Sequence, residues 1–87
     1  MLELATLTAK ELRGYQIERF RRDAREHPER PDYQLHLASL LLADKQKEEA
    51  LREFRLLLGL NANSQVWEEA GSLLLRSGEY VLAREFL

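Results

Sequence analysis

The sequence has 87 residues, enough for one domain that buries roughly 60–65% of the surface its unfolded chain would expose. Apolar residues make up 45% of the chain and charged residues 32%, a composition that excludes intrinsic disorder. The formal net charge of −2 gives no overall attraction to nucleic acid or to an anionic membrane. The lack of cysteine excludes disulfides and thiolate metal sites.

Apolar residues recur three and four positions apart along the whole chain, which predicts an all-helical fold without strands. We expect a first helix over about 9–26, after an N-terminal tail formed by residues 1–7. Thr8 and Glu11 have the spacing of a capping box, in which each side chain accepts a hydrogen bond from the backbone of the other residue. The helix is expected to end before Pro28, because the residue that precedes a proline disfavours the helical conformation.

A second and a third helix are expected over 31–43 and 47–58, joined by a short turn at 44–46. Pro31 suits the first turn of a helix, where its missing N–H would have no partner anyway. Gly59 is expected to end the third helix in the left-handed conformation that glycine adopts readily.

The rest of the chain predicts two further helices. After a loop at 61–64, Ser64 is expected to cap the start of a fourth helix that runs to about Arg76. A turn at 77–78 then leads into a fifth helix, which continues to Leu87. Helices joined alternately by short turns and slightly longer loops are typical of an array of antiparallel hairpins.

A short internal repeat is the strongest signal in the sequence. Five residues return 33 positions later, Ala38-Ser39-Leu40-Leu41-Leu42 as Gly71-Ser72-Leu73-Leu74-Leu75. A repeat of this period in a short chain indicates a solenoid, in which successive hairpins stack on one another. We therefore expect an all-α solenoid of antiparallel helix hairpins with about five helices.

The repeat divides the chain into one unit over 31–63 and a second, truncated unit over 64–87. In register, the two units align Gln34-x2-Leu37-Ala38-x2-Leu41 with Trp67-x2-Ala70-Gly71-x2-Leu74, and Ala50-x3-Phe54 with Ala83-x3-Leu87. This pattern resembles the tetratricopeptide repeat, which reads W-x2-L-G-x2-Y, then A-x3-F, then P. The chain departs from the pattern at Gln34, Leu41, Leu74 and Ala62.

The resemblance covers residues 8 to 87. Residues 8–28 resemble the second helix of a preceding repeat, because Phe20 and Pro28 lie 34 positions before Phe54 and Ala62. The match implies a tetratricopeptide-like superhelix that begins with half a repeat.

The resemblance also implies a binding surface, since family members bind an extended or helical peptide in a groove lined by the first helix of each repeat. The corresponding residues here are Asp32, Leu35, Ser39, Leu42, Ala43, Gln65, Glu68, Ser72, Leu75 and Arg76. The alternative is that the leucines of this set pack against a neighbouring unit. Members that bind the C-terminal carboxylate of a chaperone carry Lys and Asn at these positions, so that ligand is not expected. A mildly acidic groove with exposed leucines favours an apolar peptide with some basic character.

The sequence offers no catalytic, metal or cofactor site, because no nucleophile lies beside a base and His27 and His36 have no convergent ligands. A run of arginines in the first helix and the loop after it consists of Arg19, Arg21, Arg22, Arg25 and Arg30. Acidic residues at i, i+4 spacing accompany them, which favours a solvated helix face over a nucleic-acid site. No apolar run approaches the ~20 residues of a membrane helix, and the start lacks the pattern of a secretory signal. We expect no membrane insertion and, by default, a cytoplasmic location.

The sequence stops within the fifth helix, without the polar terminal helix that a solenoid needs. Either the chain is a piece of a longer array, or another copy covers an apolar end formed by Tyr80, Phe86 and Leu87. We therefore expect a non-catalytic scaffold that binds a protein or peptide partner. The alternative is a structural module that forms homodimers or larger assemblies.

Overall fold

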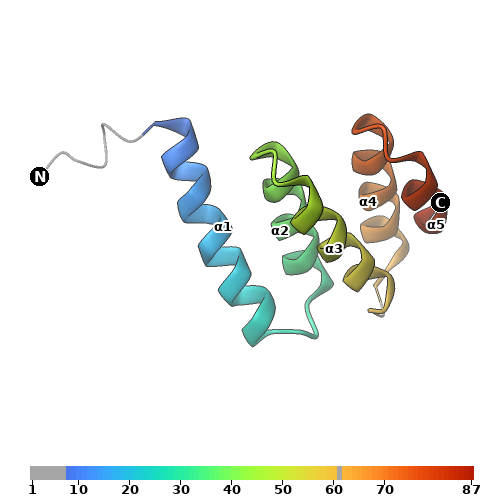
Figure 1. The fold of residues 1–87 in the computed structure, drawn as a ribbon. Coiled ribbons are helices and arrows are strands. Elements are labelled where there is room, and N and C mark those ends of the chain that lie inside the picture. Colours follow the sequence, from blue (N-terminus) through green and yellow to red (C-terminus); the bar gives the residue numbers. More distant parts are fainter. Residues whose placement is uncertain (1–7, 61) are drawn as a thin grey trace, which may run out of the picture.

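The computed structural model describes residues 8–60 and 62–87, which form five α-helices and no strand. The helices are α1 (Ala9–Glu26), α2 (Pro31–Ala43), α3 (Lys47–Leu58), α4 (Ser64–Arg76) and α5 (Tyr80–Phe86). They follow one another in a row, with α1 at one end and α5 at the other (Figure 1). The predicted all-helical class is confirmed. The predicted tail 1–7 and Asn61 of the predicted loop lie outside the described residues.

Short turns pair the helices into two hairpins, α2 with α3 (hairpin 1) and α4 with α5 (hairpin 2). The central helix is α2, which packs against α1, α3 and α4. The two first helices of the hairpins, α2 and α4, therefore lie next to each other.

The starts of α1 and α2 agree with the sequence prediction. The backbone N–H of Glu11 donates to Thr8 Oγ1 at 3.1 Å, and the backbone N–H of Thr8 donates to Glu11 Oε1 at 2.9 Å. Both bonds satisfy amides that have no partner inside the helix, which stabilises the first turn of α1. Pro31 is the first residue of α2, as expected.

Two helix-end predictions are wrong. Gly59 has a φ of −85°, so it is not left-handed. Its N–H donates to the carbonyl of Leu56 at 3.0 Å, which tightens the last turn of α3 without reversing its hand. The cap of α4 is Asn63 instead of Ser64, since the Asn63 side chain accepts a hydrogen bond from the Val66 N–H at 2.9 Å. Both residues are good caps, so composition alone did not distinguish them.

Two apolar clusters form the core. One joins α1 to hairpin 1 and consists of Ile17, Ala24, Leu37, Leu41 and Ala50. The other joins the two hairpins and consists of Leu35, Ala38, Phe54, Leu57, Ala70, Leu74, Ala83 and Phe86. The alanines at positions 38, 50, 70 and 83 are fully buried. Small side chains at these positions let neighbouring helices approach closely.

Charged contacts supplement the cluster between α1 and hairpin 1. Asp44 Oδ1 lies 3.4 Å from Lys10 Nζ and 3.5 Å from Arg13 Nη1, and Arg21 forms an ion pair with Glu49. The interface between the hairpins is mainly apolar, with one ion pair at its edge between Lys47 Nζ and Glu79 Oε2 at 2.6 Å. The docking of α1 therefore depends more on charge than the docking of hairpin 2 does.

Candidate functional site

The residues predicted to line a groove lie on the neighbouring helices α2 and α4, at equivalent positions 33 residues apart. Most of them reach solvent. We call the accessible members the α2/α4 strip, and they are Asp32, Ser39, Leu42, Ala43, Gln65, Glu68, Ser72, Leu75 and Arg76.

Leu35 does not line this strip, because its side chain is only 4% exposed and belongs to the core cluster between the hairpins. The alternative considered for the leucines, packing against a neighbouring unit, therefore holds for Leu35. Leu42 is half-buried and packs against both core clusters. Leu75 is 42% exposed and is the main apolar contact that the strip offers.

The two polar residues that α2 contributes to the strip already form hydrogen bonds within the chain. Arg30 donates to the Asp32 carboxylate from Nε at 3.1 Å and from Nη2 at 2.9 Å, and this pairing lowers the pKa of Asp32. The hydroxyl of Ser39 donates to the carbonyl of His36 at 2.9 Å. On α4, by contrast, Glu68 forms no ion pair with any other described residue. The acidic character of the strip therefore resides on α4.

The predicted apolar end on α5 is only partly exposed. Tyr80 is 63% exposed and Leu87 is 67% exposed. The prediction that Phe86 belongs to an exposed end is wrong, because its side chain is only 6% exposed. Its ring centroid lies 5.2 Å from that of Trp67 and 6.3 Å from that of Phe54. The fifth helix turns Phe86 into the core between the hairpins. Val81, which the sequence reasoning missed, is 79% exposed.

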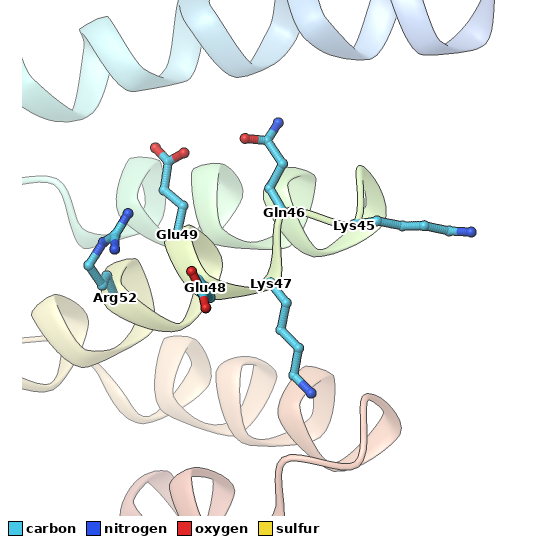
Figure 2. A pocket seen from close by; sticks show the side chains of 6 residues that line it. All are labelled: Lys45, Gln46, Lys47, Glu48, Glu49 and Arg52. Carbon is cyan, nitrogen blue, oxygen red and sulfur yellow. The ribbon is translucent and has the colours of Figure 1, made fainter.

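A shallow hollow lies at the start of α3, lined by Lys45, Gln46, Lys47, Glu48, Glu49 and Arg52. Figure 2 shows that Glu49 and Gln46 point toward α1, whereas Lys47 points toward hairpin 2. These directions fit the ion pairs of Glu49 with Arg21 and of Lys47 with Glu79. All six lining residues are polar, and ligand pockets are mostly apolar, so the hollow lacks the character of a small-molecule site.

A second depression, of about 210 Å³, lies between α1 and α3 over α2. We call it the α1–α3 cleft, and its lining residues are Arg21, Ala24, Arg25, Gln34, Leu37, Glu53 and Leu56. Within it, Gln34 Nε2 donates a hydrogen bond to Glu53 Oε1. Burial raises the pKa of Glu53, and the neighbouring charge of Glu49 raises it further.

The Gln34–Glu53 pair occupies the place that two aromatic rings occupy in hairpin 2. Trp67 and Phe86 lie 33 positions after Gln34 and Glu53, respectively, and their rings are in contact. Gln34 departs from the aromatic pattern of the repeat, and its pairing with Glu53 was not predicted. The 33-residue register would have placed the two residues together.

The described residues contain no group of three or more His, Asp or Glu side chains placed to hold a metal ion. His36 instead stacks on Phe20, with ring centroids 5.1 Å apart, and its Nδ1 lies 2.9 Å from the carbonyl oxygen of Asp32. None of the described helices is long and apolar enough to cross a bilayer.

Comparisons with known proteins give no further guide. No protein-family model matches the chain, and neither a curated protein nor a solved structure does. The chain is therefore described by its all-helical class and by the surfaces set out above.

Proposed function

We propose that this chain is a non-catalytic interaction module of the tetratricopeptide-like kind, which binds a segment of a partner protein along the α2/α4 strip. The observation that carries the proposal is the contact between α2 and α4, which brings equivalent positions of two repeated helices side by side. The turns at the ends of these helices share the same hydrogen bonds at an offset of 33 residues, which supports the repeat on which the proposal rests.

The chemistry of the strip favours a segment that combines an apolar side chain with a basic one. Leu75 offers an exposed apolar contact, and its burial by a partner would be favourable. Glu68 and Glu69 are exposed about one turn before Ser72 and two turns before Leu75 on the same helix, and they would attract a basic side chain. Leu35 lies in the core beneath the strip and offers no surface to a partner.

Selection of peptides from a random display library against the chain tests this function. Selected peptides are expected to bind the Leu75→Glu variant more weakly, because a carboxylate replaces the apolar contact. Val81→Glu is the matched control, since Val81 is also an exposed apolar residue but lies on α5. Peptides whose affinity is unchanged by Leu75→Glu but lowered by Val81→Glu would contradict the proposal. Such a result would place the binding surface at the α5 end.

A second candidate function is self-association through the α5 end. The observation that favours it is the exposure of Tyr80, Val81 and Leu87 on one short helix and the residue after it. Light scattering coupled to size exclusion over a wide range of concentrations tests it. A dimer that dissociates in the Leu87→Glu variant supports self-association, whereas a monomer at every concentration contradicts it.

A further inference from the structure

The α1–α3 cleft combines polar groups that packing alone does not require. Hairpin 1 has Gln34 and Glu53 at the positions where hairpin 2 has its aromatic pair. The carboxyl group of Glu53 is therefore half-buried, where its charged form is disfavoured. Departures of this kind from the local packing pattern are typical of sites that serve binding.

The arginines around the cleft have unused hydrogen-bonding capacity. The Nε atom of Arg21 is buried and has no hydrogen-bond partner among residues 8–60 and 62–87, with Glu18 Oε2 at 3.6 Å. Arg25 lies one helical turn after Arg21 on the same face of α1, is exposed, and forms no ion pair with any other described residue. Arg52 of α3 is exposed and does not line the cleft, but its charge, like those of Arg21 and Arg25, opposes the rise in the pKa of Glu53.

The arginines near the cleft outnumber its carboxylates. Glu49 forms an ion pair with Arg21, whereas the hydrogen bond from the neutral Gln34 amide leaves the charge of Glu53 in place. The charges of Arg25 and Arg52 both act on Glu53, so these two arginines together carry one positive charge more than Glu53 balances. This balance favours an anionic ligand over a cationic one.

The size and the apolar part of the cleft restrict the ligand further. A volume of about 210 Å³ is smaller than the roughly 300–1,000 Å³ of typical small-molecule pockets, so it admits a side chain more readily than a cofactor. The buried side chain of Leu37 contributes to the lining, and Leu56, which is 59% exposed, offers an apolar surface at the same cleft.

We propose that the α1–α3 cleft binds an acidic side chain of a partner protein, whose carboxylate pairs with Arg25 and whose neighbouring apolar residue packs on Leu56. This surface shares no residue with the α2/α4 strip, so it is a second and independent docking site. Its lining residues come from α1, α2 and α3, so the ligand would contact both α1 and hairpin 1.

Titration of the chain with two capped dipeptides, Ac-Glu-Leu-amide and Ac-Gln-Leu-amide, tests the proposal by backbone amide chemical shifts. We expect the Glu peptide to shift amides of the cleft residues and the Gln peptide to bind more weakly, by a factor of about two to five, as for an exposed ion pair. Equal binding of the two peptides, or shifts confined to the α2/α4 strip, would overturn the proposal.

Three variants strengthen the test. Arg25→Ala is expected to weaken the Glu peptide by the same factor of about two to five. Arg22→Ala is the matched control, because Arg22 is an exposed arginine of α1 that does not line the cleft. Glu53→Gln removes a carboxyl group that repels the ligand and is expected to tighten binding. Weaker binding of the Glu peptide to Glu53→Gln would contradict the proposal, because it would show that the cleft prefers a cation. Titration with inorganic phosphate would contradict it as well if phosphate shifts the cleft amides and the Glu peptide does not, since the cleft would then be a phosphate site.

Discussion

Lys45 and Gly78 occupy equivalent places in the two hairpin turns, and both have a left-handed backbone, with φ of 63° and 81°. The same hydrogen bonds surround them. The N–H of Lys45 donates to the carbonyl of Leu42 at 3.0 Å, and the N–H of Gly78 donates to the carbonyl of Leu75 at 3.0 Å. Both hairpins therefore turn through one conformation, which suits glycine but is strained for lysine.

Substitution of these two residues is predicted to have opposite effects on stability. Lys45→Gly removes the strain of a left-handed side chain and is expected to raise the free energy of unfolding by about 0.5–1 kcal/mol. Gly78→Ala introduces the same strain and is expected to lower it by about 1 kcal/mol. Urea unfolding followed by circular dichroism measures both. Effects of the same sign would mean that the two turns do not share a conformation.

The sequence predicted the five helices well, because their limits depend on local signals. The caps at Thr8 and Glu11 and the proline at Pro31 act within one or two turns of the chain, and the structure follows them. The prediction at Gly59 was wrong because the chain leaves α3 through a tight right-handed turn, which glycine permits as readily as a left-handed one.

The candidate surfaces were harder to predict, because they depend on contacts between distant residues. Leu35 follows the same spacing as the exposed members of the α2/α4 strip, yet hairpin 2 covers it. Phe86 was expected at an open end, but its contact with Trp67 turns it inward. The bond between Gln34 and Glu53 spans α2 and α3, and helical periodicity within one helix carries no information about it.

Gly14 lies inside α1, and its substitution by alanine is predicted to stabilise the chain. A Cβ atom at this position would have no neighbour within 4 Å outside the helix, so alanine introduces no clash. Alanine is favoured over glycine in a helix interior by about 1 kcal/mol. The free energy of unfolding of Gly14→Ala should rise by about that amount. An unchanged or lower value would mean that Gly14 permits a bend or a contact of α1 that alanine disturbs.

Phe54 and Leu87 occupy equivalent positions of the repeat but differ in burial. Phe54 is fully buried between the hairpins, whereas Leu87 is 67% exposed and its side chain lies against Gly71. Phe54→Ala is expected to cost about 3–5 kcal/mol through lost contacts and a cavity, and Phe54→Leu about 1 kcal/mol. Leu87→Ala is expected to cost less than about 1 kcal/mol. Thermal unfolding of the three variants measures the contrast, and a cost for Leu87→Ala that matches Phe54→Ala would contradict it.

Glu53 predicts a distinctive dependence of stability on pH. Burial, aided by the charge of Glu49, raises its pKa in the folded state above the ordinary value of 4.5, which the unfolded chain retains. The folded state therefore holds the Glu53 proton to a higher pH than the unfolded state does. Ionisation of Glu53 costs stability at neutral pH, and this cost disappears as the pH falls through the folded-state pKa toward 4.5.

Comparison of Glu53→Gln with the wild type isolates this effect. The amide oxygen of a glutamine can still accept the hydrogen bond from Gln34, and the amide carries no charge. The variant is expected to be more stable than the wild type at pH 7, and the difference should vanish below about pH 4.5. Carboxyl groups with a lowered pKa, such as Asp32 and Asp44, stabilise the folded state less as the pH falls. Both proteins contain these groups, so their contributions cancel in the difference between the two free energies of unfolding.

Glu69→Gln is the control for this prediction, because Glu69 is exposed on α4 and its substitution should change the free energy of unfolding by less than about 0.5 kcal/mol at any pH. Urea unfolding at several pH values between 4 and 8 measures all three proteins. A wild type that is more stable than Glu53→Gln at pH 7 would mean that the surrounding arginines outweigh burial, so that Glu53 serves as a structural ion-pair partner. In that case Glu53 would be paired with these arginines, and less positive charge would be left in the α1–α3 cleft for a ligand.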